Sequence, residues 1–130
     1  MNKSTSVRHV KFFKCDLCGN VVAKLVDQGT PLVCCGETMR ELLPNAVTEE
    51  NRKYLPVVEL KDGVLHVKSC SNTHCQPEEH DRMFYWIATA CGGYYLDPCG
   101  KHEFTVECGA ERPTALYKYC SRHGLWCVEL

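Results

Sequence analysis

The sequence predicts a mainly β protein in two parts, a short N-terminal module stapled by a metal ion and a larger β-sandwich. Four of the eleven cysteines lie between residues 15 and 36. Short runs rich in β-branched and aromatic residues follow from residue 54 onward, and a polar connector containing prolines lies between the two regions. We therefore place a boundary near residue 40, which gives domains 1–40 and 41–130.

The composition limits the partners and the compartment. The chain has 130 residues and a formal net charge of −1, so no basic field favours nucleic acid or an anionic membrane. No long apolar run predicts a transmembrane helix. The first residues, "MNKSTSVRHVKFFK", lack the apolar stretch of a signal peptide. We expect a cytoplasmic protein with no nucleic-acid or membrane partner.

The first cysteine cluster predicts a metal centre. An odd number of cysteines without an export signal favours reduced, metal-binding thiols over a disulfide framework. Cys15 and Cys18 form a Cys-x-x-Cys pair, and Cys34 and Cys35 are adjacent. Four thiolates fit a tetrahedral zinc or iron ion, and the spacing does not separate these two metals. A module this short needs such a staple, because its apolar core is too small to hold it.

Strand signals run through both parts. In the module, Val21-Val22 and Leu32-Val33 fit short strands around a turn at Gly29. In the second part, alternation in "HEFTVEC" predicts a strand with Phe104 and Val106 on its buried face. Several such strands, separated by turn residues, predict an immunoglobulin-like β-sandwich. The expected strands are "YLPVVEL", "GVLHVKS", "RMFYWIATA", "HEFTVEC" and "ALYKYC", with turns at Asp62-Gly63, Gly92-Gly93, 98–100 and 109–113.

The remaining cysteines have no close Cys-x-x-Cys pairing. We interpret most of them as buried thiols that behave as small apolar residues. Cys75 follows His74 and could approach a second site, and Cys91 and Cys99 could face one another across a turn. The set comprises Cys70, Cys75, Cys91, Cys99, Cys108 and Cys127.

The cysteine module resembles desulforedoxin. The pattern is "YxCxxCGN…CCG", and here the aromatic position is Phe13, two residues before Cys15. The resemblance implies a one-iron, four-cysteine centre that transfers single electrons.

The rest of the chain resembles the catalytic domain of desulfoferrodoxins, the two-iron superoxide reductases. The matching segments are "NAVTEENRKYLPVVE", "THCQPEEH" before a Trp-Ile strand, and the terminal "YCSRHGLW". In that family a second iron is held by four histidines in a plane and one axial cysteine. The resemblance implies His74, His80 and His123 as equatorial ligands and Cys120 as the axial thiolate.

One ligand position departs from the family pattern. Tyr54 stands where the fourth histidine belongs, and Arg52 replaces the carboxylate that usually precedes the retained Lys53. Iron could bind with water in the vacant place, or Tyr54 could ligate as a phenolate. The second site could also be empty, or it could hold zinc, since three nitrogens and one sulfur suit that ion. Tyr54 could also simply pack over the metal. Replacement by His66 is disfavoured, because its alternating strand position is typical of a surface residue.

The resemblance implies the one-electron reduction of superoxide to hydrogen peroxide, with Lys53 attracting the anion. It also implies an electron-donor protein, such as a rubredoxin-like carrier, and a homodimer. Tyr54 keeps two alternatives open. One is an electron carrier or redox sensor that uses only the four-cysteine iron, and the other is a structural zinc protein.

Overall fold

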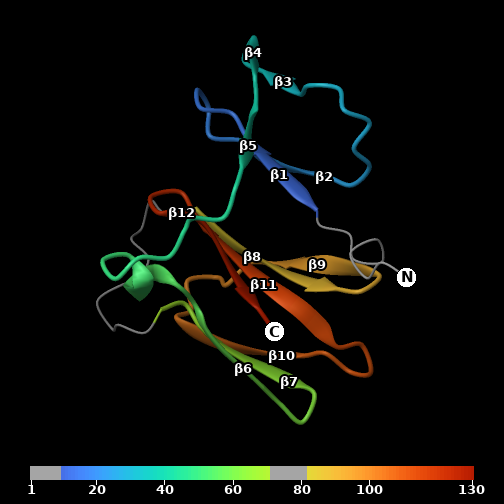
Figure 1. The fold of residues 1–130 in the computed structure, drawn as a ribbon, viewed down its shortest axis with the longest axis vertical. Coiled ribbons are helices and arrows are strands. Elements are labelled where there is room, and N and C mark those ends of the chain that lie inside the picture. The colour runs from blue at the N-terminus through green and yellow to red at the C-terminus, as the bar shows by residue number, and fades with distance from the viewer. Residues whose placement is uncertain (1–9, 71–81) are drawn as a thin grey trace. The chain divides into compact units, whose positions relative to one another are not determined.

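The computed structural model describes residues 10–70 and 82–130, and this part of the chain is mainly β, as predicted. It divides into two compact units, one ending at Leu43 and the other running from Pro44 to Leu130 (Figure 1). The described residues contain no helix with the length and apolar character that crossing a membrane requires.

The N-terminal unit consists of two small antiparallel sheets. One has the order β2-β1-β5, and the other pairs β3 with β4. Their core is small, and Phe12, Met39 and Leu42 supply its apolar side chains together with Cys15. The strands are β1 (Lys11–Lys14), β2 (Val21–Lys24), β3 (Val33–Cys34), β4 (Glu37–Thr38) and β5 (Arg40–Leu42).

The larger unit has two antiparallel sheets, which confirms the predicted sandwich. Their orders are β10-β7-β6 and β12-β11-β8-β9. A 3₁₀ turn, η2 (Arg52–Tyr54), precedes the first of these strands. The strands are β6 (Val57–Lys61), β7 (Val64–Lys68), β8 (Met83–Thr89), β9 (Gly92–Leu96), β10 (Glu103–Glu107), β11 (Pro113–Cys120) and β12 (Gly124–Glu129).

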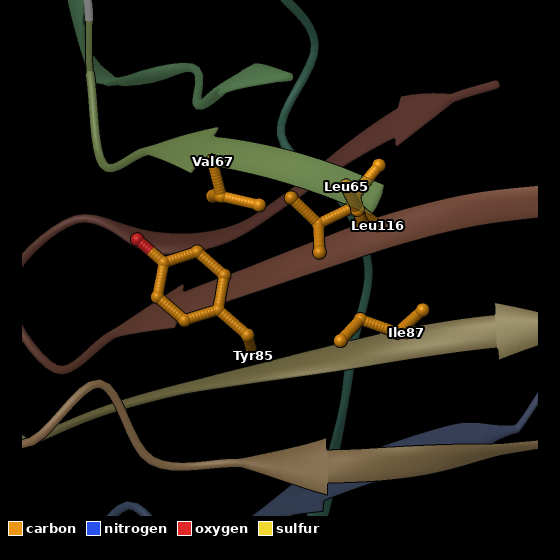
Figure 2. Close-up of a cluster of buried hydrophobic side chains, with 5 residues drawn as sticks. All are labelled: Leu65, Val67, Tyr85, Ile87 and Leu116. Atoms are coloured by element: carbon orange, nitrogen blue, oxygen red, sulfur yellow. The ribbon is translucent and has the colours of Figure 1, made fainter. Parts of the chain in front are cut away.

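The sandwich core lies between β7 of one sheet and strands β8 and β11 of the other. Figure 2 shows Leu65 and Val67 of β7 above Tyr85 and Ile87 of β8, with Leu116 of β11 beside them. All five are at most 2% exposed. Burying each such side chain stabilises the fold by about 1.5–3 kcal/mol. The predicted alternation in β10 is confirmed, because Phe104 and Val106 pack against this cluster.

The predicted hairpin turn at Asp62-Gly63 is confirmed, and the predicted turn at Gly92-Gly93 is wrong in part. Asp62 and Gly63 both have positive φ, as a two-residue hairpin loop requires. Gly92 and Gly93 instead begin strand β9. A Cβ on Gly93 would lie 2.6 Å from Nε1 of Trp86, so glycine leaves room for the indole on the neighbouring strand.

Candidate metal centres

The four cysteines of the N-terminal unit converge. One ligand atom from each lies within 4.8 Å of every other. The Sγ atoms of Cys18 and Cys34 are 3.6 Å apart, and those of Cys34 and Cys35 are 4.0 Å apart. Tetrahedral bonds of about 2.3 Å to one ion would separate sulfurs by about 3.8 Å. The residues therefore fit a four-thiolate metal centre, as the spacing predicts.

A tight hairpin explains how two adjacent cysteines reach one ion. Cys35 and Gly36 are the two loop residues between β3 and β4, with φ values of 56° and 76°. Two central residues with positive φ are typical of a type I′ turn. Cys35 therefore has a left-handed backbone conformation that residues with a side chain rarely adopt. This conformation brings the Sγ of Cys35 to 4.0 Å from the Sγ of Cys34.

Polar groups surround the sulfurs. The Cys18 amide lies 3.5 Å from Sγ of Cys15, and Nδ2 of Asn20 lies 3.6 Å from Sγ of Cys34. The amide at Cys18 is the main cause that lowers the pKa of Cys15 to about 7. The neighbouring thiols raise the pKa of Cys35 to about 12, with Cys18 the largest cause. Four crowded sulfurs thus do not all ionise without a cation, and a bound metal supplies that charge.

The end of β11 carries the second candidate pair. Cys120 is buried at the end of this strand, and His123 lies in the turn to β12. Cys120 Sγ and His123 Nδ1 are 3.8 Å apart. Metal–sulfur and metal–nitrogen bonds of about 2.3 and about 2.1 Å can together span this distance, so one ion could contact both atoms. His74 and His80, the other predicted ligands, lie outside the described residues.

Tyr54 lies against the face of His123. Their ring centroids are 4.0 Å apart with an angle of 18° between the planes. The Trp126 ring lies 6.0 Å from that of Tyr54. An ion bound in the plane of the imidazole would be separated from the phenol plane by the stacking distance. A metal–oxygen bond is about 2.0–2.2 Å long, so the two stacked rings do not suit one ion in this arrangement.

The two cations before Tyr54 are exposed. Lys53 holds its Nζ 5.3 Å from the centre of the Tyr54 ring. Arg52 opens the 3₁₀ turn. Both side chains face solvent, so an ammonium is available at the edge of the candidate site. His66 is exposed on β7, as expected for a surface residue.

A buried lysine lies on the inner face of the same sheet. Lys118 is 4% exposed, and its Nζ donates hydrogen bonds to the carbonyl oxygens of Tyr54 and Ser69. Ser69 is fully buried and its Oγ lies 2.7 Å from Nδ1 of His102. Burial lowers the pKa of Lys118 to about 8, and the charge of Cys120 opposes that shift.

The connector is fastened to the turn that bears His123. Asn45 donates its backbone N–H to the carbonyl of Leu125, and its Nδ2 to the carbonyl of His123, both at 2.8 Å. Gly124 has a φ of +86°, and a Cβ there would lie 2.9 Å from Nδ2 of Asn45. The turn is therefore held from outside the sheet by the first residues of the connector.

The surplus cysteines correct one interpretation. Cys70 is disulfide-bonded, so it is not a free thiol. Cys91 and Cys99 are free but exposed, so they are neither buried nor linked across their turn. Cys108 and Cys127 are half-buried free thiols, and burial raises the pKa of Cys127. Sequence alone did not distinguish these three environments, because each cysteine is isolated in its segment. Cys75 lies outside the described residues.

Three of the supporting residues were not predicted from the sequence. Lys118 carried a signal, since it interrupts an aromatic strand two residues before Cys120 and therefore shares its face. Asn20 is the last residue of the "CxxCGN" motif, although its contact with Cys34 was not predicted, and Asn45 carried no signal beyond the polarity of a loop. Their roles depend on contacts with residues distant in the sequence.

The fold and the cysteine cluster define a mainly β metalloprotein with a four-thiolate centre, and comparisons with known proteins identify its family. The model of the desulfoferrodoxin N-terminal domain matches residues 7–42. A desulfoferrodoxin of Syntrophotalea carbinolica is 35% identical over 92% of this chain and 96% of its own length. Another, from Desulfarculus baarsii, is 32% identical over 92% of this chain and 96% of its own length.

The chain belongs to the desulfoferrodoxin family. The crystal structure of the superoxide reductase from Treponema pallidum shares the fold, with a TM-score of 0.73 and 23% identity over 94% of this chain and 99% of that one. Desulforedoxin of Megalodesulfovibrio gigas is 59% identical over 27 residues, which are 21% of this chain and 73% of that protein. Family membership and the cysteine cluster together support iron as the metal of the first centre.

Proposed function

We propose that this protein is a superoxide reductase-like non-haem iron protein that reduces superoxide by one electron to hydrogen peroxide. The proposal assigns a second iron to Cys120, His123, His74 and His80. The observation that carries it is the convergence of Cys120 and His123, with 3.8 Å between Sγ and Nδ1, in a chain of this family. When bound, iron supplies the electron, and two protons complete the product.

The residues around the pair suit an anionic substrate. Lys53 keeps an exposed ammonium beside Tyr54, where it would attract superoxide and hold a water that carries a proton. Arg52 adds a second positive charge on the same turn. An external donor, such as a rubredoxin-like carrier, would return the electron through the four-cysteine iron. We also propose that the protein is a homodimer and that it is cytoplasmic.

The position of Tyr54 favours a second candidate function. A phenol stacked on the imidazole packs over the site and does not replace the missing nitrogen ligand. With three histidines and one cysteine the site could hold zinc, since that set suits a tetrahedral ion. The protein would then be an electron carrier or redox sensor that works through the four-cysteine iron alone.

Metal analysis of the iron-loaded full chain, combined with a peroxide assay, separates the two functions. Two irons per chain, with hydrogen peroxide formed from superoxide and no oxygen released, are expected of the reductase. One iron and no superoxide consumption would refute it and favour the carrier.

The variant Tyr54→His tests the departure itself, because it restores the family ligand. We expect superoxide consumption to rise by about tenfold or more, the range in which metal-site contacts act. Tyr95→His, at an exposed tyrosine of β9, is the matched control and should change nothing. An unchanged rate in Tyr54→His would mean that Tyr54 does not stand in a ligand position.

A further inference from the structure

Lys118 is a buried cation that the proposed reaction does not use. It lies two residues before the end of β11, and its strand partners are Tyr85 on β8 and Trp126 on β12, both buried. Burying an ammonium costs several kcal/mol unless other groups offset the lost hydration. In the described part of the chain its Nζ bonds to main-chain oxygens and forms no ion pair with a carboxylate.

The two acceptors of Lys118 belong to separate segments. One is the carbonyl of Tyr54 at 2.9 Å, which ends the turn η2, and the other is the carbonyl of Ser69, just after β7. Neither segment is paired with β11 in a sheet. One ammonium therefore joins η2 and the end of β7 to the strand that leads to Cys120.

Each fastened segment has a second attachment. Ser69 donates its N–H to the carbonyl of His102 at 2.9 Å and contacts Nδ1 of that residue through Oγ. Tyr54 has two attachments as well. Its carbonyl accepts a hydrogen bond from Lys118, and its ring stacks on the imidazole of His123. Moving the main chain of Tyr54 would shift its ring from the face of His123.

Lys118 and Cys120 also share a face of β11. Residues two apart on a strand point to the same side, and both side chains are buried on the inner side of the sheet.

We propose that Lys118 is a positioning residue of the Cys120–His123 site. Its ammonium fixes η2 and the end of β7 and thereby holds the Tyr54 ring against His123. The inference rests on the proposed function in assigning a metal to this pair, but its mechanical part holds in the metal-free chain.

The first test uses the metal-free full chain and amide hydrogen exchange. The variant Lys118→Met removes the charge and the donors at similar length, while Lys118→Arg keeps both. The amides of Leu55, bonded to Arg52, and Ser69, bonded to His102, report the two fastened segments. We expect exchange about tenfold faster in Lys118→Met and near the wild-type rate in Lys118→Arg. Equal protection in Lys118→Met and wild type would overturn the proposal.

A matched control and a reserve variant keep this test decisive. Lys61→Met changes an exposed lysine on β6 and should leave both amides unchanged. If Lys118→Met does not fold, Lys118→Gln, which removes the charge and shortens the side chain, is measured in the same way with the same expectation. Fast exchange in Lys61→Met as well would contradict a specific role for Lys118.

The second test follows the sulfur-to-metal absorption band of the iron-loaded protein. For wild type and for each Lys118 variant, we subtract the spectrum of the same protein that also carries Cys120→Ser. The difference removes the contribution of the four-cysteine centre. We expect the band to shift in Lys118→Met, because the Tyr54 ring is no longer held against His123, and to stay in place in Lys118→Arg. A flat difference spectrum in wild type would refute the proposed function alone, whereas the exchange rates decide the role of Lys118 independently.

Discussion

The two units of this protein solve the problem of stability in different ways. The N-terminal unit buries four apolar side chains, namely Phe12, Cys15, Met39 and Leu42. The larger unit packs two sheets around a continuous core in which five side chains are almost fully enclosed (Figure 2). So small a core cannot offset the conformational entropy of its chain, so we expect the first unit to depend on its metal and the second to be stabilised by its apolar core.

Metal removal should therefore have the largest effect, and in one unit only. We expect Cys18→Ser in the full chain to lose the metal of the first centre and to unfold the N-terminal unit, because one thiolate of four is gone. Heteronuclear NMR should show collapsed amide dispersion for residues up to 43 and native shifts in β7, β8 and β11. Cys91→Ser, at an exposed free thiol, is the control. Retention of native shifts in β1 and β5 would contradict the dependence on metal.

A core substitution in the sandwich should have the second largest effect. It should destabilise the larger unit and leave the N-terminal unit unchanged. Leu116 is fully buried between the sheets, so Leu116→Ala removes three carbons and leaves a cavity. We expect the free energy of unfolding of the larger unit to fall by about 2–5 kcal/mol. Urea titration followed by the fluorescence of Trp86 and Trp126, both in this unit, measures the change. The absorption of the four-cysteine centre should survive to the same urea concentration as in wild type, and coincident loss would show that the units unfold together.

The smallest expected effect concerns Asp27, which links the ends of the β1–β2 region. Its carboxylate contacts Lys24 at 2.8 Å, Lys11 at 3.0 Å and the amide of Gly29 at 2.9 Å. The hydrogen bond from Lys24 is the main cause that holds the pKa of Asp27 well below its usual range. Since the folded pKa is depressed, the ionised carboxylate stabilises the unit above the ordinary value of about 3.9. That contribution is lost as the pH falls toward the folded pKa.

An NMR titration of the Gly29 amide reads this ionisation directly. In wild type the midpoint should lie well below about 3.9, and in Lys24→Met it should move upward toward that value. Asp27→Asn should abolish the titration and slightly destabilise the N-terminal unit at neutral pH. Because Asp27 and Lys11 are exposed, the stability change should be small. A wild-type midpoint at the ordinary carboxyl value would refute the stabilising contacts of the ionised Asp27.

The sequence was informative where the signal was local. The Cys15-x-x-Cys18 and Cys34-Cys35 spacing predicted the cluster, and alternation around Phe104 predicted β10 and its buried face. Strand β9 was missed because Gly92-Gly93 has the composition of a turn, and only the packing of Trp86 over Gly93 explains glycine in a strand. Strand β12 was missed because its residues, Gly124–Glu129, lack the strict polar–apolar alternation of a half-buried strand.

The candidate second site was predictable in part. The short spacing of Cys120 and His123 predicted their approach, but the stacking of Tyr54 and the bonds of Lys118 join residues 49 positions apart or more. Such contacts depend on how the sheets and the turn η2 pack, and no local pattern encodes them. The ligand roles of His74 and His80 remain a prediction.

The attachment of Asn45 has a consequence for protein engineering. Two hydrogen bonds tie this residue to the turn at positions 123–125, and Gly124 leaves just enough room for its amide. Any chimera that exchanges the N-terminal unit for another should therefore be spliced at or before Pro44. A junction placed later would remove a brace of the loop bearing His123, and a loss of activity in such a hybrid would then be misattributed to the transplanted domain.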